Sequence, residues 1–192
     1  MSKLKALGVF CGADIGNDPI FANAASQLGE ELGKRKLELV FGYGLKGIMG
    51  ALVRQAKISG ARIVGVITKH LFKFEHSSLD VDELIVVSSM QIRKDIMFNR
   101  ADAFCVLPGG FGTLDELFEI ITLRQIGEMN KPIIIANIDG FWSDAEALLL
   151  EVIKRGFAQE KHKYLFTMVD KIEDVIPTIE KELDTLEAWG AL

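Results

Sequence analysis

Short runs rich in apolar and β-branched residues alternate along the chain with longer segments whose apolar residues recur every three or four positions. The short runs predict strands over 6–11, 37–41, 62–67, 83–87, 103–107 and 132–137. A first helix is predicted from Asp18 and Pro19 to near Gly33, and others over 45–59, 90–100, 113–126, 143–155 and 172–186. This alternation predicts an α/β fold with a Rossmann-like, doubly wound, mostly parallel sheet flanked by helices.

Size and composition favour a single domain that binds a small molecule. The 192 residues, 49% of them hydrophobic, suffice for one domain over 1–192 with a sizeable core. A net charge of −5 argues against a nucleic-acid surface, and no apolar run is long enough to favour membrane insertion. Cys11 and Cys105 lie in strand-like runs without a Cys-x-x-Cys pair or a secretory signal, so we expect reduced core residues of a cytoplasmic protein.

One segment joins a strand, a glycine loop and the start of a helix. After the apolar run 103–107, the chain reads Pro108-Gly109-Gly110-Phe111-Gly112-Thr113-Leu114-Asp115-Glu116. Glycines let the backbone approach a ligand closely, and the N–H groups of a helix that begins at Thr113 carry partial positive charge. The segment therefore predicts a phosphate site, although Thr113 to Glu116 also matches the capping box that merely begins a helix.

A second glycine segment, Gly42-Tyr43-Gly44-Leu45-Lys46-Gly47, has the form of a dinucleotide fingerprint between a strand and a helix. It follows the second strand instead of the first. The carboxylate that should hold a ribose hydroxyl about twenty residues later is missing, because the run 62–67 leads into Thr68. We therefore interpret Gly44 and Gly47 as a second wall of a nucleotide pocket and disfavour a nicotinamide-dependent enzyme.

A cationic pair, Arg93 and Lys94, lies in the segment that starts at Met90. If the helix begins near Ser89, the helix dipole disfavours each positive charge there by about 0.3 to 1 kcal/mol. Such a local cost is typical of functional positions, and the pair would neutralise an anionic ligand beside the phosphate loop. Two exposed, solubilising residues would give the same pattern.

Arg93-Lys94 and the segment 108–116 resemble the arginine–lysine pair and the PGGxGTxxE signature of the Lonely Guy (LOG) family, the cytokinin-activating phosphoribohydrolases. Weaker similarities are Val9 to Gly12, Pro19, Gly47 to Gly50, Gly65 to Ile67 and Gly140 to Trp142. The resemblance implies hydrolysis of the N-glycosidic bond of an adenosine 5′-monophosphate, N6-modified or not, to a free base and ribose 5-phosphate. It also implies a homodimer, no metal and no organic cofactor.

The resemblance assigns the catalytic pair to Arg93 and Glu116. Glu116 would stabilise oxocarbenium character on the sugar and orient or deprotonate water, while Arg93 would hold substrate or stabilise charge on the leaving base. Asp115 and Glu119 are expected to be solvated surface residues. Substrate binding is implied for Gly44, Gly47, Met90, Lys94, Gly109, Gly110, Gly112 and Thr113.

Several positions depart from the family pattern. Asp14 replaces a usual serine and adds a carboxylate to a loop expected to line the site, and Tyr43 interrupts a usual run of glycines. Thr68 and Gln91 replace a usual proline and histidine. These departures leave the choice between adenine and an N6-prenylated base open. Tyr43 fills pocket volume, stacks on a base or is an ordinary loop substitution.

Two features remain outside this scheme. The segment 69–80 is either a flap over the pocket or an ordinary crossover, and His70, His76 and His162 lack metal-ligand spacing and are expected at the surface.

A non-catalytic nucleotide-binding or sensing module is the main alternative to a hydrolase. A pyridoxal-phosphate decarboxylase would need a Schiff-base lysine and a pyridinium partner, for which the sequence offers no constellation.

Overall fold

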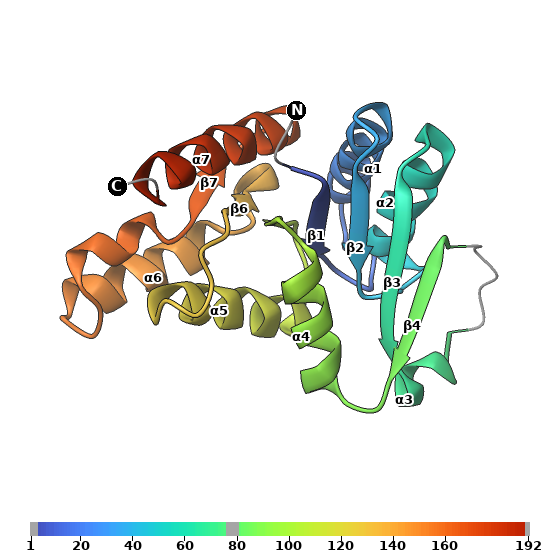
Figure 1. Ribbon diagram of the computed structural model, residues 1–192, viewed down its shortest axis with the longest axis horizontal. Coiled ribbons are helices and arrows are strands. Elements are labelled where there is room, and N and C mark those ends of the chain that lie inside the picture. The colour runs from blue at the N-terminus through green and yellow to red at the C-terminus, as the bar shows by residue number, and fades with distance from the viewer. Residues whose placement is uncertain (1–3, 76–80, 191–192) are drawn as a thin grey trace.

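The computed structural model describes residues 4–75 and 81–190, which form an all-parallel sheet with helices on both faces (Figure 1). The strand order is β4-β3-β2-β1-β5-β6-β7. This order confirms the predicted doubly wound α/β fold. The strands are β1 (Ala6–Phe10), β2 (Glu38–Phe41), β3 (Arg62–Thr68), β4 (Glu83–Val87), β5 (Ala103–Val106), β6 (Ile133–Ala136) and β7 (Thr167–Val169).

The helices divide between the two faces of the sheet and bury two separate hydrophobic cores. One core contains residues of α1, α2 and α7. The other contains residues of α4 and α5, and partly buried side chains of α6 pack against it. Helix α3 is a single turn beside the β3–β4 edge. The helices are α1 (Pro19–Lys34), α2 (Gly47–Ser59), α3 (Lys69–Phe72), α4 (Met90–Arg100), α5 (Phe111–Gln125), α6 (Ser143–Lys154) and α7 (Val175–Gly190).

Helix α1 shows how local sequence signals and packing combine. The Asp18 carboxylate accepts a hydrogen bond from the Ile20 N–H at 2.8 Å, and Pro19 is the first helical residue, as predicted. Gly33 lies near the end of the helix, as predicted, one residue before Lys34. A Cβ atom there would lie 2.3 Å from the Cβ of Ser59, so this glycine permits the close packing of α1 on α2.

Some predicted boundaries were wrong. Helix α5 begins at Phe111, two residues before Thr113, and α7 begins at Val175 after a 3-10 turn over Ile172–Asp174. Strand β7 and helix α3 were not predicted, because β7 is only three residues long and half-buried, and α3 is a single turn. Short elements of this kind carry too few residues to show a periodicity.

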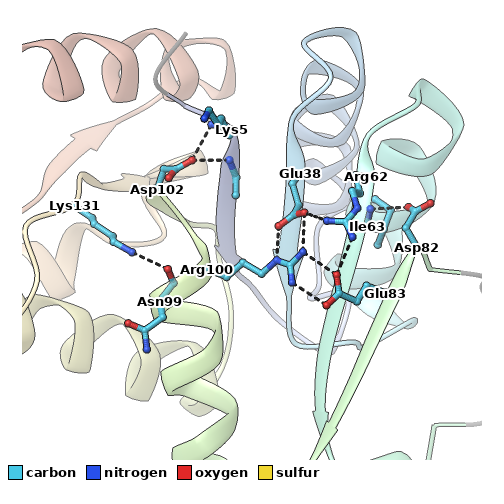
Figure 2. Close-up of polar contacts among 11 residues, drawn as sticks. Lys5, Glu38, Arg62, Ile63, Asp82, Glu83, Asn99, Arg100, Asp102 and Lys131 are labelled. Atoms are coloured by element: carbon cyan, nitrogen blue, oxygen red, sulfur yellow. Dashed lines mark hydrogen bonds and ion pairs between the residues drawn. The ribbon is translucent and has the colours of Figure 1, made fainter. Parts of the chain in front are cut away.

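An ion-pair network ties α4 to the amino ends of β2, β3 and β4 (Figure 2). Arg100, the last residue of α4, donates to Glu38 at 2.6 Å and to Glu83 at 2.8 Å. Arg62 also pairs with Glu83 at 2.8 Å and contacts Glu38. The network therefore fixes one end of the sheet and leaves the carboxyl ends of the strands for the loops.

The chain reverses its winding direction at β1, which pairs with β2 on one side and β5 on the other. The loops that follow β1 and β5 therefore separate above the carboxyl edge, where ligands bind in folds of this type. The Gly12 N–H donates to the Pro108 carbonyl at 3.0 Å, which holds the bases of the two loops together. No helix within residues 4–75 or 81–190 is long and apolar enough to cross a membrane.

Candidate active site at the switch point

A cavity of about 480 Å³ opens between the loops after β1 and β5. Its polar wall contains Arg93 of α4, Glu116 of α5 and the start of α5. Its remaining walls are largely apolar and come from the loop after β1, from α1, α2, α3 and α4, and from the turn after β6. The lining includes Gly12, Asp14, Phe21, Ile48, Met49, Leu71, Met90, Gly109, Gly110, Phe111, Gly112, Thr113 and Phe141.

The start of α5 presents free amide groups to this cavity. Gly110 is the cap residue, and the first intrahelical bond runs from the Leu114 N–H to the Gly110 carbonyl at 3.1 Å. Within the described residues, no backbone acceptor faces the N–H groups of Phe111, Gly112 and Thr113. Cβ atoms at Gly110 or Gly112 would meet nothing within 4 Å. These donors, at the positive end of the helix dipole, have the geometry of an anion site.

Thr113 does not begin the helix, so the alternative of a capping box at Thr113 was wrong. The N-cap position belongs to Gly110, whose hydrogen side chain makes no cap bond, and Thr113 is buried in the first turn. Its hydroxyl lies under Gly109, where a Cβ atom would approach Oγ1 to 2.1 Å. The glycine loop therefore folds tightly over the threonine side chain.

Arg93 and Glu116 form a buried ion pair between α4 and α5. Nη1 of Arg93 lies 3.1 Å from Oε1 of Glu116, and Nε donates to the Val66 carbonyl of β3 at 3.0 Å. Arg93 is 6% exposed and Glu116 is 8% exposed. Ser89 caps α4 as predicted, and its hydroxyl accepts from the Ile92 N–H at 3.3 Å. The alternative that Arg93 and Lys94 are exposed solubilising residues was therefore wrong.

Burial raises the pKa of Glu116 to about 7, although the positive charge and hydrogen bond of Arg93 oppose this shift. A carboxyl group with this pKa exchanges a proton readily near neutral pH, as general acid or base chemistry requires. Burial also raises the pKa of Cys11 well above its usual range, and the charge of Glu116 adds to this effect. Cys11 is thus a protonated thiol in the cavity wall, and Cys105 is also free and buried.

Lys94 serves the helix interface. Its ammonium lies 2.9 Å from Oδ2 of Asp115 and also pairs with Glu119, and Lys94 is not among the residues that line the cavity. Burial lowers the pKa of Lys94, but the bonds to Glu119 and Asp115 outweigh burial and raise it. Glu119 is consequently an interface residue, whereas the expectation had placed it in solvent.

The second glycine segment lies behind the β1 loop. A Cβ atom at Gly47, whose φ is +55°, would lie 2.2 Å from the Ala13 carbonyl oxygen, and Gly44 packs against Met49. The first amides of α2 are already occupied, since the Met49 N–H donates to the Gly12 carbonyl at 3.2 Å and the Ile48 N–H to Asp14 at 3.3 Å. Neither Gly44 nor Gly47 is among the lining residues of the described cavity.

Tyr43 lies in the hydrophobic core between Phe41 and Phe72, outside the cavity lining. Its φ of 54° places a non-glycine residue in the left-handed region. Gly65 makes room for its ring, because a Cβ atom there would lie 2.5 Å from Cδ2 of Tyr43. Asp14, the other departure from the family pattern, does line the cavity.

The apolar walls were not predicted from the sequence. Phe21, Ile48, Leu71 and Phe141 come from α1, α2, α3 and the turn after β6. The sequence signals for this wall were the weak similarities at 47–50 and 140–142 and the possible flap over 69–80, which contains Leu71. Tertiary packing alone brings these residues together.

The described residues leave little for metal binding. Within 4–75 and 81–190, no group of three His, Cys, Asp or Glu side chains could hold a metal ion. His70 is exposed, and the half-buried His162 accepts through Nδ1 from the Gln159 N–H at 3.0 Å. His76 and the end of the predicted flap, 76–80, lie outside the described residues.

The sequence of this chain is similar to one known protein family over most of its length. Residues 49–179 match a family model described as possible lysine decarboxylase. The cytokinin riboside 5′-monophosphate phosphoribohydrolase LOG1 of Arabidopsis thaliana is 38% identical over 94% of this chain and 88% of its own length. LOG7 of the same plant, which carries the same enzyme name, is 34% identical over 94% of this chain and 83% of its own length.

Solved structures show the same fold at lower sequence identity. The molybdenum cofactor carrier protein of Chlamydomonas reinhardtii gives a TM-score of 0.71 at 19% identity, over 95% of this chain and 99% of that chain. The molybdenum cofactor binding protein of Rippkaea orientalis gives a TM-score of 0.70 at 22% identity, with the same coverage. These two structures support the fold class alone.

Proposed function

The chain belongs to the LOG family, and we propose that it hydrolyses the N-glycosidic bond of an adenosine 5′-monophosphate to a free base and ribose 5-phosphate. One observation carries the proposal: the buried Arg93–Glu116 pair, joined at 3.1 Å, stands one turn beyond the free amides of α5. Family membership and the phosphoribohydrolase relatives support the same reaction class.

The 5′-phosphate would bind at the start of α5. The N–H groups of Phe111, Gly112 and Thr113 supply neutral donors, and the helix dipole favours an anion there. Gly109 and Gly110 let the phosphate approach the backbone. Binding energy from this unreacting group would then position the sugar against Glu116, so an unphosphorylated nucleoside should react poorly.

The chemical step would break the C1′–N9 bond, with the electron pair leaving on the base. Glu116 would stabilise the positive charge that develops at C1′ and take a proton from the water that adds there. Arg93 holds the Glu116 carboxylate at 3.1 Å and would stabilise negative charge on the departing base until the base takes up the proton that water gave to Glu116. A pKa of about 7 at Glu116 suits this proton transfer.

The apolar walls of the cavity support a base with an apolar N6 substituent over plain adenine. Phe21, Ile48, Met49, Leu71 and Phe141 offer surface that a purine alone would leave in contact with water. Burial of such a substituent would stabilise the complex at about 25 cal/mol per Å² of apolar area. The cytokinin phosphoribohydrolase relatives are consistent with this choice.

We further propose that the protein is a cytoplasmic homodimer. Exposed apolar side chains on α4, α5 and α6 support an interface with a second copy, and Phe111 beside the cavity is 92% exposed. Other exposed apolar residues on these helices or at their ends include Met90, Ile92, Ile126, Leu148, Leu150 and Val152. Sedimentation at micromolar concentration should give twice the chain mass. The free cysteines Cys11 and Cys105 fit a reducing compartment.

The experiment compares the wild type with Glu116→Gln and with Glu173→Gln, a control in an exposed glutamate of the turn before α7. Base release from adenosine monophosphate and its N6-isopentenyl analogue is followed chromatographically, and binding by calorimetry. We expect Glu116→Gln to lower the rate at least about 100-fold while it largely keeps binding. Full activity in that variant would contradict the proposal. Binding without base release in the wild type would favour a nucleotide sensor.

A further inference from the structure

The guanidinium of Arg93 lies against the backbone at the end of β2. Nε donates to Val66 at 3.0 Å, and Nη1 faces Glu116 at 3.1 Å. The third nitrogen, Nη2, lies over Gly42, the residue that follows β2. A Cβ atom at Gly42 would lie 1.8 Å from Nη2 and 3.0 Å from Cζ, and its three nearest neighbours would all be atoms of Arg93.

We propose that Gly42 is a positioning residue: its missing side chain forms the seat in which the guanidinium of Arg93 lies, so that Nη1 is aimed at Glu116. The catalytic consequence of this seat rests on the function proposed above. Gly42 has no left-handed φ that would require glycine, so the requirement is one of space.

The other glycines of the motif, Gly44 and Gly47, also pack against protein atoms, which argues against a nucleotide-binding loop. Gly44 packs against Met49, and Gly47 packs against Ala13. In the described part of the chain, none of the three glycines of the motif lines the cavity. The amides at the start of α2 are occupied by the carbonyls of the β1 loop. The segment that resembles a dinucleotide fingerprint therefore supports the arginine and the β1 loop.

A methyl group at Gly42 would force Arg93 to move. Ordinary contact requires about 3.5 Å between heavy atoms, so the guanidinium must shift by more than an ångström. The guanidinium is held by the 3.0 Å bond to Val66 and the 3.1 Å contact with Glu116, so we expect a shift of this size to lengthen the contact with Glu116. Glu116 would then lose part of the nearby positive charge that lowers its pKa against the effect of burial.

The test is direct titration of Glu116 by carbon NMR of its carboxyl group, in the full chain without substrate. We expect Gly42→Ala to raise the pKa of Glu116 by about one pH unit above the wild-type value, as loss of a nearby opposite charge does. Gly44→Ala is the matched control in the same loop, since the closest atom to its methyl would be the sulfur of the flexible Met49 side chain, at 2.8 Å, and it should leave the titration unchanged. An unchanged titration in folded Gly42→Ala would overturn the proposal.

Combining Gly42→Ala with Arg93→Ala distinguishes an effect that acts through Arg93 from a general disturbance of the structure. If Gly42 acts through the arginine, Gly42→Ala should shift the Glu116 titration no further in an Arg93→Ala background. Should Gly42→Ala alone unfold, the double variant is expected to regain the fold, because the clashing side chain is gone. An additive shift, or a double variant as unstable as Gly42→Ala, would overturn the proposal.

Activity gives a second readout that separates this inference from the proposed function. In an active enzyme, Gly42→Ala should lower kcat about tenfold or more and move the acid limb of the pH–rate profile upward with the Glu116 titration. A wild type that releases no base would defeat the proposed hydrolysis, while the titration would still decide the role of Gly42. If Gly42→Ala lowered kcat but changed neither the pKa of Glu116 nor the acid limb of the pH–rate profile, the positioning role of Gly42 would be overturned and the proposed hydrolysis would stand.

Discussion

Replacement of Glu116 by glutamine should change how the stability of the protein depends on pH. Burial raises the pKa of this carboxyl from 4.5 to about 7, so the folded state favours the protonated form. Its stabilising contribution is complete below pH 4.5 and is lost as the pH rises through 7. At about 1.4 kcal/mol per pH unit, the loss is about 3 kcal/mol. Glutamine does not titrate and lacks this dependence.

The assay is urea unfolding of the wild type and Glu116→Gln at intervals from pH 4.5 to 8.5. The free energy of unfolding of the wild type, minus that of the variant, should fall by about 3 kcal/mol up to pH 7.5 and then level off. Arginine stays charged throughout this range, so the altered surroundings of Arg93 add only a constant offset. A difference that stays constant, or that rises with pH, would refute the assignment of a buried, protonated carboxyl.

Three further predictions address the fold and the cavity. Arg100→Met removes the charged hydrogen bonds to Glu38 and Glu83, so chemical denaturation should show a loss of about 2 kcal/mol; no loss would contradict the network's role. Asp14→Ser removes a negative charge from the cavity, and the KM for a nucleoside monophosphate should fall several-fold in dilute buffer but little in high salt. Phe141→Ala should raise the KM for the N6-isopentenyl substrate about tenfold more than that for adenosine monophosphate; an equal effect would remove Phe141 from the base pocket.

The sequence predicted the parts of the fold that repeat a pattern over many residues. Six strands and the capped start of α1 follow from hydrophobic periodicity and from Asp18-Pro19. The start of α5 was not predicted correctly, because Gly110 caps the helix without a side-chain hydrogen bond. The residues 113–116 match the capping-box pattern and so indicated a start at Thr113. The three residues of β7 are too few to show alternation.

The sequence identified candidate site residues but did not predict the contacts that some of them make. The resemblance to the family signature identified Arg93 and Glu116 as candidates, and the structure brings Nη1 of Arg93 within 3.1 Å of Oε1 of Glu116. The roles of Lys94 and Gly47 depend on contacts with segments distant in the sequence: Lys94 pairs with two carboxylates on α5, and Gly47 packs on the β1 loop. Local pattern carries no information about such partners, and the same reason hid the apolar walls of the cavity.

The most direct test of the account is product analysis after incubation with adenosine monophosphate, its N6-isopentenyl analogue and the two unphosphorylated nucleosides. We predict that free base and ribose 5-phosphate appear only from the phosphorylated compounds, and faster from the isopentenyl analogue. Intact nucleotides after prolonged incubation with folded protein, or equal release from the unphosphorylated nucleosides, would contradict a phosphoribohydrolase that anchors its substrate at the start of α5.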